Sequence, residues 1–304
     1  PAGETPFGEQ INLYTGELTF SQTDFSFPGT GPEFGVTRFT VTSLEDVSQE
    51  PLPSGNWDMA IPRIQTLIAP TMGWKTMPSP GVQTDARCTY FGTAWSGSAT
   101  GITLITDSGE SQPVLKRHAF NTQKPVILND VGQTMAVPIV TNANWQIGCL
   151  TSAATGGNGE GFMAVSPQGV RYWLTHLVTS KVEMIVERDN DATIRTFRDL
   201  ARMYVTKIQD RFGNTVNFTW NGKQLTRIQA SDGRRVDFTW RTDVPVISSV
   251  TMYAADATPR TWQYQYYVYT QELFFGEIQK ANLTAVVLPD GSKWQYSGNV
   301  GVAY

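Results

Sequence analysis

A short repeat in the C-terminal half constrains the fold of this chain more than any other feature. Residues 205–220 recur at residues 225–240, an offset of 20 residues, with Thr, Ile, Gln, Gly, Val, Phe, Thr and Trp in register. A third copy runs from Leu283 to Tyr296, a degenerate copy covers residues 247–266, and residues 167–174 form an upstream relative. Self-similarity at a fixed period is typical of stacked supersecondary units. We therefore expect each copy to be one such unit.

The second copy shows what one unit is. Asp232-Gly233 is a strong hairpin signal, because glycine adopts positive φ without a Cβ clash. Val236, Phe238 and Trp240 then alternate with polar residues, which is the pattern of a half-buried strand. A single hairpin is marginally stable in water, so neighbouring hairpins must pair edge to edge. Because strand twist accumulates, the resulting sheet must curl.

The composition agrees with an all-β fold. Aromatic residues make up 12% of the 304 residues, and 27 Gly and 17 Pro supply turns. Charged residues are 16%, below the roughly 25% of ordinary globular proteins. We predict many short antiparallel strands and hairpins that form a curved, spiralling repeat sheet. A stretch at residues 193–203 has apolar residues at helical spacing, and it fits either a helix or a connection between strands.

Charge and hydropathy exclude two classes of partner. The formal net charge is −4 and no basic cluster is longer than a pair such as Arg234-Arg235, so a nucleic-acid partner is not expected. No run of about 18 apolar residues is present, so we expect no membrane span. The chain begins with Pro1 instead of Met, and residues 1–4 do not resemble a secretory signal. We expect a processed product or fragment whose targeting segment lies outside this sequence.

The N-terminal half contains shorter strand signals. We predict a hairpin over residues 11–20 that turns at Thr15-Gly16, a strand ended by Pro28-Gly29, and a strand at residues 35–42. From residue 81 to 161 the pattern is looser, with short strands and surface loops. We therefore divide the chain into an N-terminal β-region at residues 1–165 and the hairpin repeats at residues 166–304.

The repeats and the region before them resemble the RHS/YD-repeat family. The repeats carry the Asp-Gly turn followed by alternating aromatics, and Ile208 to Asn214 is similar to the family's opening phrase. The N-terminal region is similar to the segment that precedes the repeats in that family. The structural motif residues given by this resemblance are Gly16, Glu17, Asp24, Pro28, Gly29, Asp210, Gly213, Asn214, Trp220, Asp232, Gly233, Trp240, Asp290 and Gly291.

The resemblance implies a β-cocoon, a hollow shell that encloses a C-terminal toxin for delivery. It implies a non-enzymatic wall or cap segment, secreted or delivered extracellularly by a bacterial secretion system. The expected partners are the rest of the repeat shell, the enclosed toxin and delivery-system proteins. The family's C-terminal self-cleavage motif and a toxin domain are absent from this sequence, and the repeats are too few to close a shell. We therefore expect an N-terminal fragment or end cap.

The candidates for catalysis are few. His118 and His176 are the two histidines, no Gly-x-Ser-x-Gly elbow occurs, and the His and Cys residues lack zinc-site spacing. We expect no enzyme activity, no metal and no cofactor. The alternatives are an extracellular adhesion or carbohydrate-binding β-module and, third, an aromatic-rich glycoside hydrolase. The last would need a carboxylate pair such as Glu17 with Asp24 or Glu272 with Glu277.

Two questions stay open at this level. Cys88 and Cys149 fit either one disulfide or two separate buried thiols. Trp220, Trp240 and Trp294 recur in register, so they fit the buried face of the sheet. In a hollow shell, the same side chains would instead face a lumen and contact unfolded cargo.

Overall fold

The computed structural model describes residues 9–11, 18–40, 52–91, 99–117, 127–129, 133–182, 185–189, 192–254, 258–273 and 276–296. Within these residues the regular elements are strands, apart from the 3₁₀ turn η2 (Ser152–Thr155). The predicted all-β class is confirmed, and the strand pairs for which a register is defined are antiparallel. Among the described residues, no helix is long and apolar enough to cross a membrane.

The chain folds as two compact units. The first comprises Pro1–Ala60, Ser180–Glu183 and Phe218–Tyr304, and the second comprises Ile61–Thr179 and Met184–Asn217. The first unit thus combines the N-terminal strands with most of the repeats. The predicted boundary between residues 165 and 166 rests on the sequence pattern alone, and it stays a prediction.

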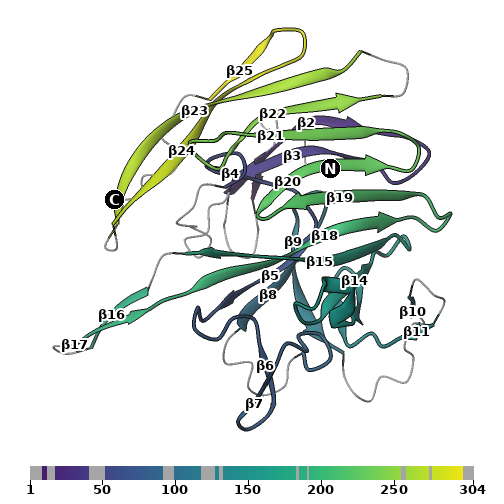
Figure 1. The fold of residues 1–304 in the computed structure, drawn as a ribbon, viewed down its shortest axis with the longest axis vertical. Coiled ribbons are helices and arrows are strands. Elements are labelled where there is room, and N and C mark those ends of the chain that lie inside the picture. Colours follow the sequence, from purple (N-terminus) through teal and green to yellow (C-terminus); the bar gives the residue numbers. More distant parts are fainter. Residues whose placement is uncertain are drawn as a thin grey trace. The chain divides into compact units, whose positions relative to one another are not determined.

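The first unit contains two antiparallel sheets (Figure 1). The N-terminal sheet has the order β1-β2-β3-β4, with strands β1 (Glu9–Ile11), β2 (Leu18–Phe27), β3 (Phe34–Thr40) and β4 (Trp57–Met59). The repeat sheet follows the chain in order, with strands β20 (Gln224–Ala230), β21 (Arg235–Trp240), β22 (Ile247–Tyr253), β23 (Arg260–Leu273), β24 (Gly276–Val287) and β25 (Lys293–Gln295). Strand β19 (Thr215–Asn221) begins in the second unit and continues into the first.

The copies of the repeat have the same strand register. In the first copy Ile208 pairs with Val216, and in the second Ile228 pairs with Val236. The third copy pairs Val286 with the exposed Trp294 in the same way. The offset of 20 residues seen in the sequence therefore corresponds to one hairpin of a meander.

The two sheets of the first unit pack face to face through alternating side chains. Strand β3 alternates buried and half-buried positions along its whole length, with Val36 only 1% exposed. Phe25 of β2 contacts Trp262 of β23, with ring centroids 4.3 Å apart. Val236 and Val250 lie buried on the repeat sheet. This shared core holds the N-terminal strands against the repeats.

The second unit is built around a closed series of strand pairs. Its strands are β5 (Arg63–Ile68), β6 (Thr76–Ser79), β7 (Val82–Thr84), β8 (Ala99–Ile105), β9 (Ser111–Lys116), β10 (Ile127–Leu128), β11 (Thr134–Met135), β12 (Ile139–Thr141), β13 (Gln146–Leu150), β14 (Gly161–Val165), β15 (Arg171–Lys181), β16 (Ile185–Asp189), β17 (Ala192–Thr196) and β18 (Asp199–Gln209). The sheet order is β15-β14-β13-β12-β9-β8-β5-β18, and β15 also pairs with β18. The remaining strands form the separate hairpins β6-β7, β10-β11 and β16-β17.

Apolar side chains fill one face of this closed sheet. Leu104, Ile64 and Met203 lie directly opposite one another on β8, β5 and β18, and each is at most 1% exposed. On the other side of the series, Ile139 pairs with Ile147 and both are fully buried. A sheet that closes on itself leaves fewer free edges and buries one face as a core.

The stretch at residues 193–203 is strand, not helix. It contains most of β17, the exposed Phe197 and the first half of β18. Strand β18 is buried on both faces from Leu200 to Val205, so its apolar residues run consecutively. Such a run lacks the simple alternation of a half-buried strand, which is why its sequence also fitted a helical stripe.

Candidate functional site: a buried ion pair beside an open pocket

A buried arginine joins the two sheets of the first unit. Arg38 on β3 donates from Nε to Oδ2 of Asp24 at 2.8 Å and from Nη2 to Oδ1 at 2.7 Å. The exposed fractions of these side chains are 0% and 4%. Asp24 lies where the register of β2 against β3 shifts between Thr23 and Phe25. Because such a bulge re-aims side chains, both Asp24 and the next residue, Phe25, point into the unit.

Three aromatic side chains surround this ion pair. The guanidinium carbon of Arg38 lies 5.2 Å from the ring centroid of Trp57, 5.7 Å from Tyr264 and 5.6 Å from Tyr296. The Tyr264 hydroxyl donates to Asp24 at 2.7 Å, and Nη2 of Arg38 donates to the Tyr296 hydroxyl at 3.0 Å. The Arg38 cluster, meaning these five residues, therefore connects β2, β3 and β4 with β23 and the end of the repeat sheet.

Burial and charge shift the pKa values inside the cluster. Burial lowers the pKa of Arg38, but the hydrogen bonds and negative charge of Asp24 more than offset this and raise it above its usual value. Burial also raises the pKa of Tyr264 well above its ordinary value, and the Asp24 carboxylate raises it further. The arginine thus stays charged and the tyrosine neutral, which suits a structural ion pair and not a proton-transfer site.

A second arginine, Arg234, binds the turn that follows β2. Arg234 donates from Nε to Asp232 at 2.9 Å, from Nη2 to the backbone oxygen of Pro32 at 3.1 Å, and from Nη1 to the backbone oxygen of Phe27. It lies so close to Gly29 that a Cβ atom there would overlap its guanidinium group. The sequence motif residues Gly29 and Asp232 are far apart in the chain, and both contact Arg234.

The repeat turns hold the other motif residues. Gly213, Gly233 and Gly291 have φ values of 92°, 92° and 83°, which only glycine adopts readily. Asp210 and Asp290 accept local hydrogen bonds within their turns, the first from the backbone nitrogen of Asn214 at 2.9 Å and the second from that of Ser292 at 2.9 Å. Pro28 lies in the exposed turn after β2. These residues shape hairpins, as local turn chemistry predicts.

The three repeat tryptophans differ in exposure. Trp220 and Trp240 are half-buried, and Nε1 of Trp240 donates to the backbone oxygen of Leu225 at 2.8 Å. Trp294 is 53% exposed. The alternative of a buried sheet face fits Trp240, and the alternative of contact with cargo stays a prediction. Trp240 packs against the sheet, whereas more than half of the Trp294 side chain is exposed.

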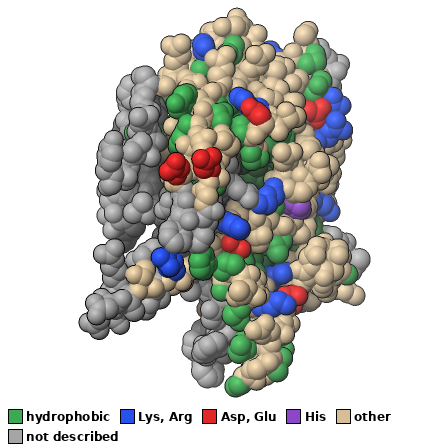
Figure 2. Space-filling view, turned by 60° about the vertical axis from the view of Figure 1, so that its left-hand side comes forward, with side chains coloured by type: hydrophobic (Ala, Val, Ile, Leu, Met, Phe, Trp, Pro, Cys, Tyr) green, Lys and Arg blue, Asp and Glu red, His purple; other side chains and the backbone are tan. Residues whose placement is uncertain are grey.

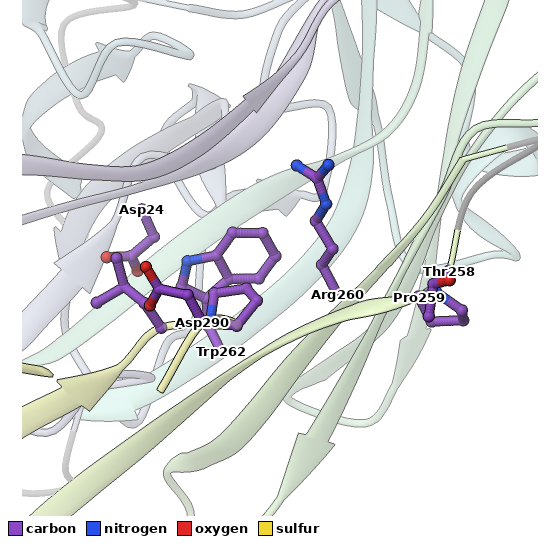
Figure 3. Close-up of a pocket in the computed structure, with 8 residues that line it drawn as sticks. Asp24, Thr258, Pro259, Arg260, Trp262 and Asp290 are labelled. Carbon is purple, nitrogen blue, oxygen red and sulfur yellow. The ribbon is translucent and has the colours of Figure 1, made fainter. Parts of the chain in front are cut away.

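An open pocket lies beside the Arg38 cluster (Figure 3). It has a volume of about 610 Å³ and is lined by Asp24, Thr258, Pro259, Arg260, Trp262, Leu288, Pro289 and Asp290. Figure 3 shows Asp24, Trp262 and Asp290 together at one end and Thr258 with Pro259 at the other. The lining combines the loop before β23, the turn between β24 and β25, and the β2 bulge. Sequence reasoning missed this pocket, since only folding brings these three segments together.

The other candidates for chemistry lie apart from this site. Gly16, Glu17 and His118 lie outside the described residues, and His176 is half-buried on β15. Glu272 and Glu277 are exposed and pair directly across the β23–β24 hairpin. Among the described residues, no three His, Cys, Asp or Glu side chains gather in a way that could hold a metal ion. On the face drawn in Figure 2, basic side chains occur singly or beside acidic ones.

In the second unit, a disulfide resolves the open question about the cysteines. Cys88 and Cys149 are bonded, with Cα atoms 5.3 Å apart. The Glu160 carboxylate accepts from the backbone nitrogens of Cys88 and Thr89, each at 2.9 Å. Arg87 donates to the backbone oxygens of Asn158 and Glu160 at 2.7 and 3.0 Å. The loop around Cys88 is therefore held to β13 and to the segment before β14 by both covalent and polar contacts.

Comparison with known proteins adds little. No family model and no curated protein matches the chain. Among solved structures, the chain is similar to the N-terminal domain of the effector protein SpvB from Salmonella typhimurium strain LT2. The identity is 10% and the TM-score 0.43, over 91% of this chain and 100% of that one. At this identity and TM-score, the likeness carries no conclusion about fold or function here.

Proposed function

We propose that this chain is a non-enzymatic wall or cap segment of an RHS-type shell that encloses a C-terminal toxin. The observation that carries the proposal is the tandem repeat itself, whose copies form successive hairpins in one register. A meander of this kind grows by adding hairpins at its edge, which is how an extended wall is built from short units. The sequence resemblance to the RHS/YD-repeat family supplies the expected cargo and delivery.

The two arginine contacts support a capping role for the N-terminal sheet. Repeat arrays commonly need capping elements that cover surface which neighbouring repeats leave open. Here the N-terminal sheet covers the later strands of the repeat sheet: Arg38 donates to the Tyr296 hydroxyl after β25, and Arg234 just before β21 donates to the backbone oxygen of Pro32. We assign the N-terminal sheet the role of this cap.

Strand β25 is where we place the contact with the next part of the shell. It pairs with β24, and within the described part of the chain its other edge pairs with no strand. The backbone oxygen of Ser292 and the backbone nitrogen of Tyr296 both hydrogen-bond toward β24, at 2.8 and 2.9 Å. Alternate residues of an antiparallel strand face the same neighbour, so Lys293 and Gln295 direct their backbone groups to the outer edge. A further strand would bind there by β-augmentation.

The disulfide supports secretion or extracellular delivery as the destination. Disulfides form and persist in oxidising compartments and are rare in the cytosol. Cys88 is fully buried, so the bond belongs to the folded core of its unit. We therefore propose that the folded chain works outside the cytosol.

The proposal is tested on the native gene product by placing a proline at the outer edge of β25. Gln295→Pro removes one outward N–H and keeps the ladder toward β24, whereas Gln295→Ala keeps both. If the shell continues from this edge, the proline variant exposes its C-terminal region to protease sooner than wild type, and the alanine variant does not. Equal protease resistance of the C-terminal region in all three proteins, or a C-terminal region that is never protected, contradicts the proposal.

A further inference from the structure

We propose that the pocket beside the Arg38 cluster binds a sugar, independently of any role in a shell. Its volume of about 610 Å³ lies within the roughly 300–1,000 Å³ of ordinary small-molecule sites. Its lining includes one exposed basic and one exposed acidic side chain, a largely buried indole, and apolar residues. The inference rests on which of these polar groups are already engaged within the protein and which are not.

Asp24, although it lines the pocket, is not available to a ligand. Its two oxygens accept from Arg38 and Tyr264, and its charge is balanced by the buried guanidinium. Asp24 and Arg38 together therefore form a fixed part of the pocket lining with no net charge. This engagement also excludes Asp24 as the general acid or the nucleophile of a glycoside hydrolase, since both roles need a carboxyl group free to contact the substrate.

Arg260 and Asp290 are the groups that face outward. Arg260 is exposed at the start of β23, and within the described residues it forms no ion pair. Asp290 uses Oδ1 to accept from the backbone nitrogen and the hydroxyl of Ser292, at 2.9 and 2.6 Å. In the described part of the chain, its Oδ2 accepts no hydrogen bond. The pocket thus offers five guanidinium donors and one free carboxylate oxygen.

Trp262 supplies an independent observation. Its side chain is 6% exposed, and its Nε1–H has no acceptor among the described residues. An unsatisfied buried donor costs about 1–3 kcal/mol, so each one calls for an explanation, and a ligand acceptor is one such explanation. Figure 3 shows this nitrogen on the side of the ring that faces Asp24 and Asp290, at the acidic end of the pocket. A ligand oxygen that enters this end, with a small adjustment of the ring, would satisfy it.

The chemistry of the lining selects a neutral polyhydroxylated ligand. A hydroxyl both donates and accepts, so neighbouring hydroxyls of a sugar can donate to Asp290 and accept from Arg260 and Trp262. The apolar face of a sugar ring packs against apolar groups, which the exposed Pro259 and Pro289 provide. The site carries one positive and one negative free group, so a strongly charged ligand gains less from it than a neutral one does.

Saturation-transfer difference NMR on the full chain tests the proposal with glucose, galactose and N-acetylglucosamine as probes and with glycine as a zwitterionic competitor. We expect transfer to the ring protons of at least one sugar, unaffected by glycine. Trp262→Phe keeps the ring and removes the N–H, and Asp290→Asn keeps a residue that suits the turn. Arg260→Ala removes the cation at an exposed site. Each is expected to weaken sugar binding about tenfold or more, as loss of one charged or buried hydrogen bond does.

Two exposed residues that do not line the pocket provide matched controls. Lys293→Ala removes a cation and Trp294→Ala removes an aromatic ring from β25, and both should leave sugar transfer unchanged. Thermal unfolding of every variant shows whether the fold is kept. The proposal is overturned if no sugar shows transfer, if the pocket variants and the controls lose it equally, or if glycine displaces the sugar.

Discussion

Replacing Asp24 with Asn removes the carboxylate that faces the buried guanidinium of Arg38 and keeps the volume of the side chain. Arg38 is fully buried, and two of its charge-assisted hydrogen bonds, at 2.7 and 2.8 Å, go to this carboxylate. Breaking a buried pair by removing one partner typically costs 3–5 kcal/mol, because a charge is left uncompensated in a poorly solvated place. We therefore expect Asp24→Asn to lower the free energy of unfolding of the first unit by roughly 3–5 kcal/mol.

The assay is urea denaturation followed by tryptophan fluorescence, in which Trp57 and Trp262 report on the first unit. The two units can unfold in separate transitions, so each transition is fitted by itself. The matched control is Asp243→Asn, which removes the partner of Arg241 in an ion pair whose side chains are 32% and 59% exposed. Exposed pairs contribute about 0.2–1 kcal/mol, so this control should change stability little.

A double variant separates the charge from the packing. Asp24→Leu with Arg38→Met replaces the pair with apolar side chains, and such replacements are often neutral or stabilising. We expect the double variant to recover part of the stability lost in Asp24→Asn, because the buried Tyr264 hydroxyl still loses its acceptor on Asp24. The reasoning is refuted if Asp24→Asn costs no more than the exposed control, or if the double variant is as unstable as the single one.

Three further perturbations test other contacts. Gly29→Ala should lower the free energy of unfolding by about 1–3 kcal/mol in wild type and by much less in an Arg234→Ala background. A double-mutant cycle measures this difference, and equal losses in the two backgrounds would contradict the close contact between Arg234 and Gly29. Replacing Cys88 and Cys149 with Ser should lower the stability of the second unit by about 4 kcal/mol, given their separation of 61 residues, and leave the transition of the first unit in place. Hydrogen bonds from Arg234 lower the pKa of Asp232, so its contribution to stability is complete above the unfolded-state pKa of about 3.9 and is lost as the pH falls through the lower folded-state value. Asp232→Asn should therefore flatten the loss of stability between about pH 5 and 3, and an unchanged acid limb would contradict this assignment.

The hairpins of the repeats could be predicted because their determinants are local. Gly213 and Gly233 lie 20 residues apart, each at a turn that requires positive φ, and alternating side chains follow each of them. The upstream relative at residues 167–174 has the same turn, with the backbone nitrogen of Gly169 donating to the oxygen of Ser166 at 2.9 Å. Turn chemistry and strand alternation operate over a few residues, so a single sequence contains all of this information.

The contacts that position the candidate site are not local. Arg38 and Tyr296 are 258 residues apart, and the hydrogen bond between them depends on how the two sheets pack. Asp24 faces inward because of a bulge, which breaks the alternation that sequence reasoning relies on. The pairing of β5 with β18 that closes the sheet of the second unit likewise joins distant strands. These features follow from tertiary packing, which one sequence does not reveal.

The shell assignment is tested most directly by the mass of the native gene product, measured after gentle purification and again after denaturation. The account predicts that this segment belongs to a much longer repeat polypeptide, or co-purifies with one, and that a small C-terminal piece separates from it only on denaturation. A stable secreted monomer of 33.6 kDa, with the same mass under both conditions, would contradict the shell and leave sugar binding as the function to pursue.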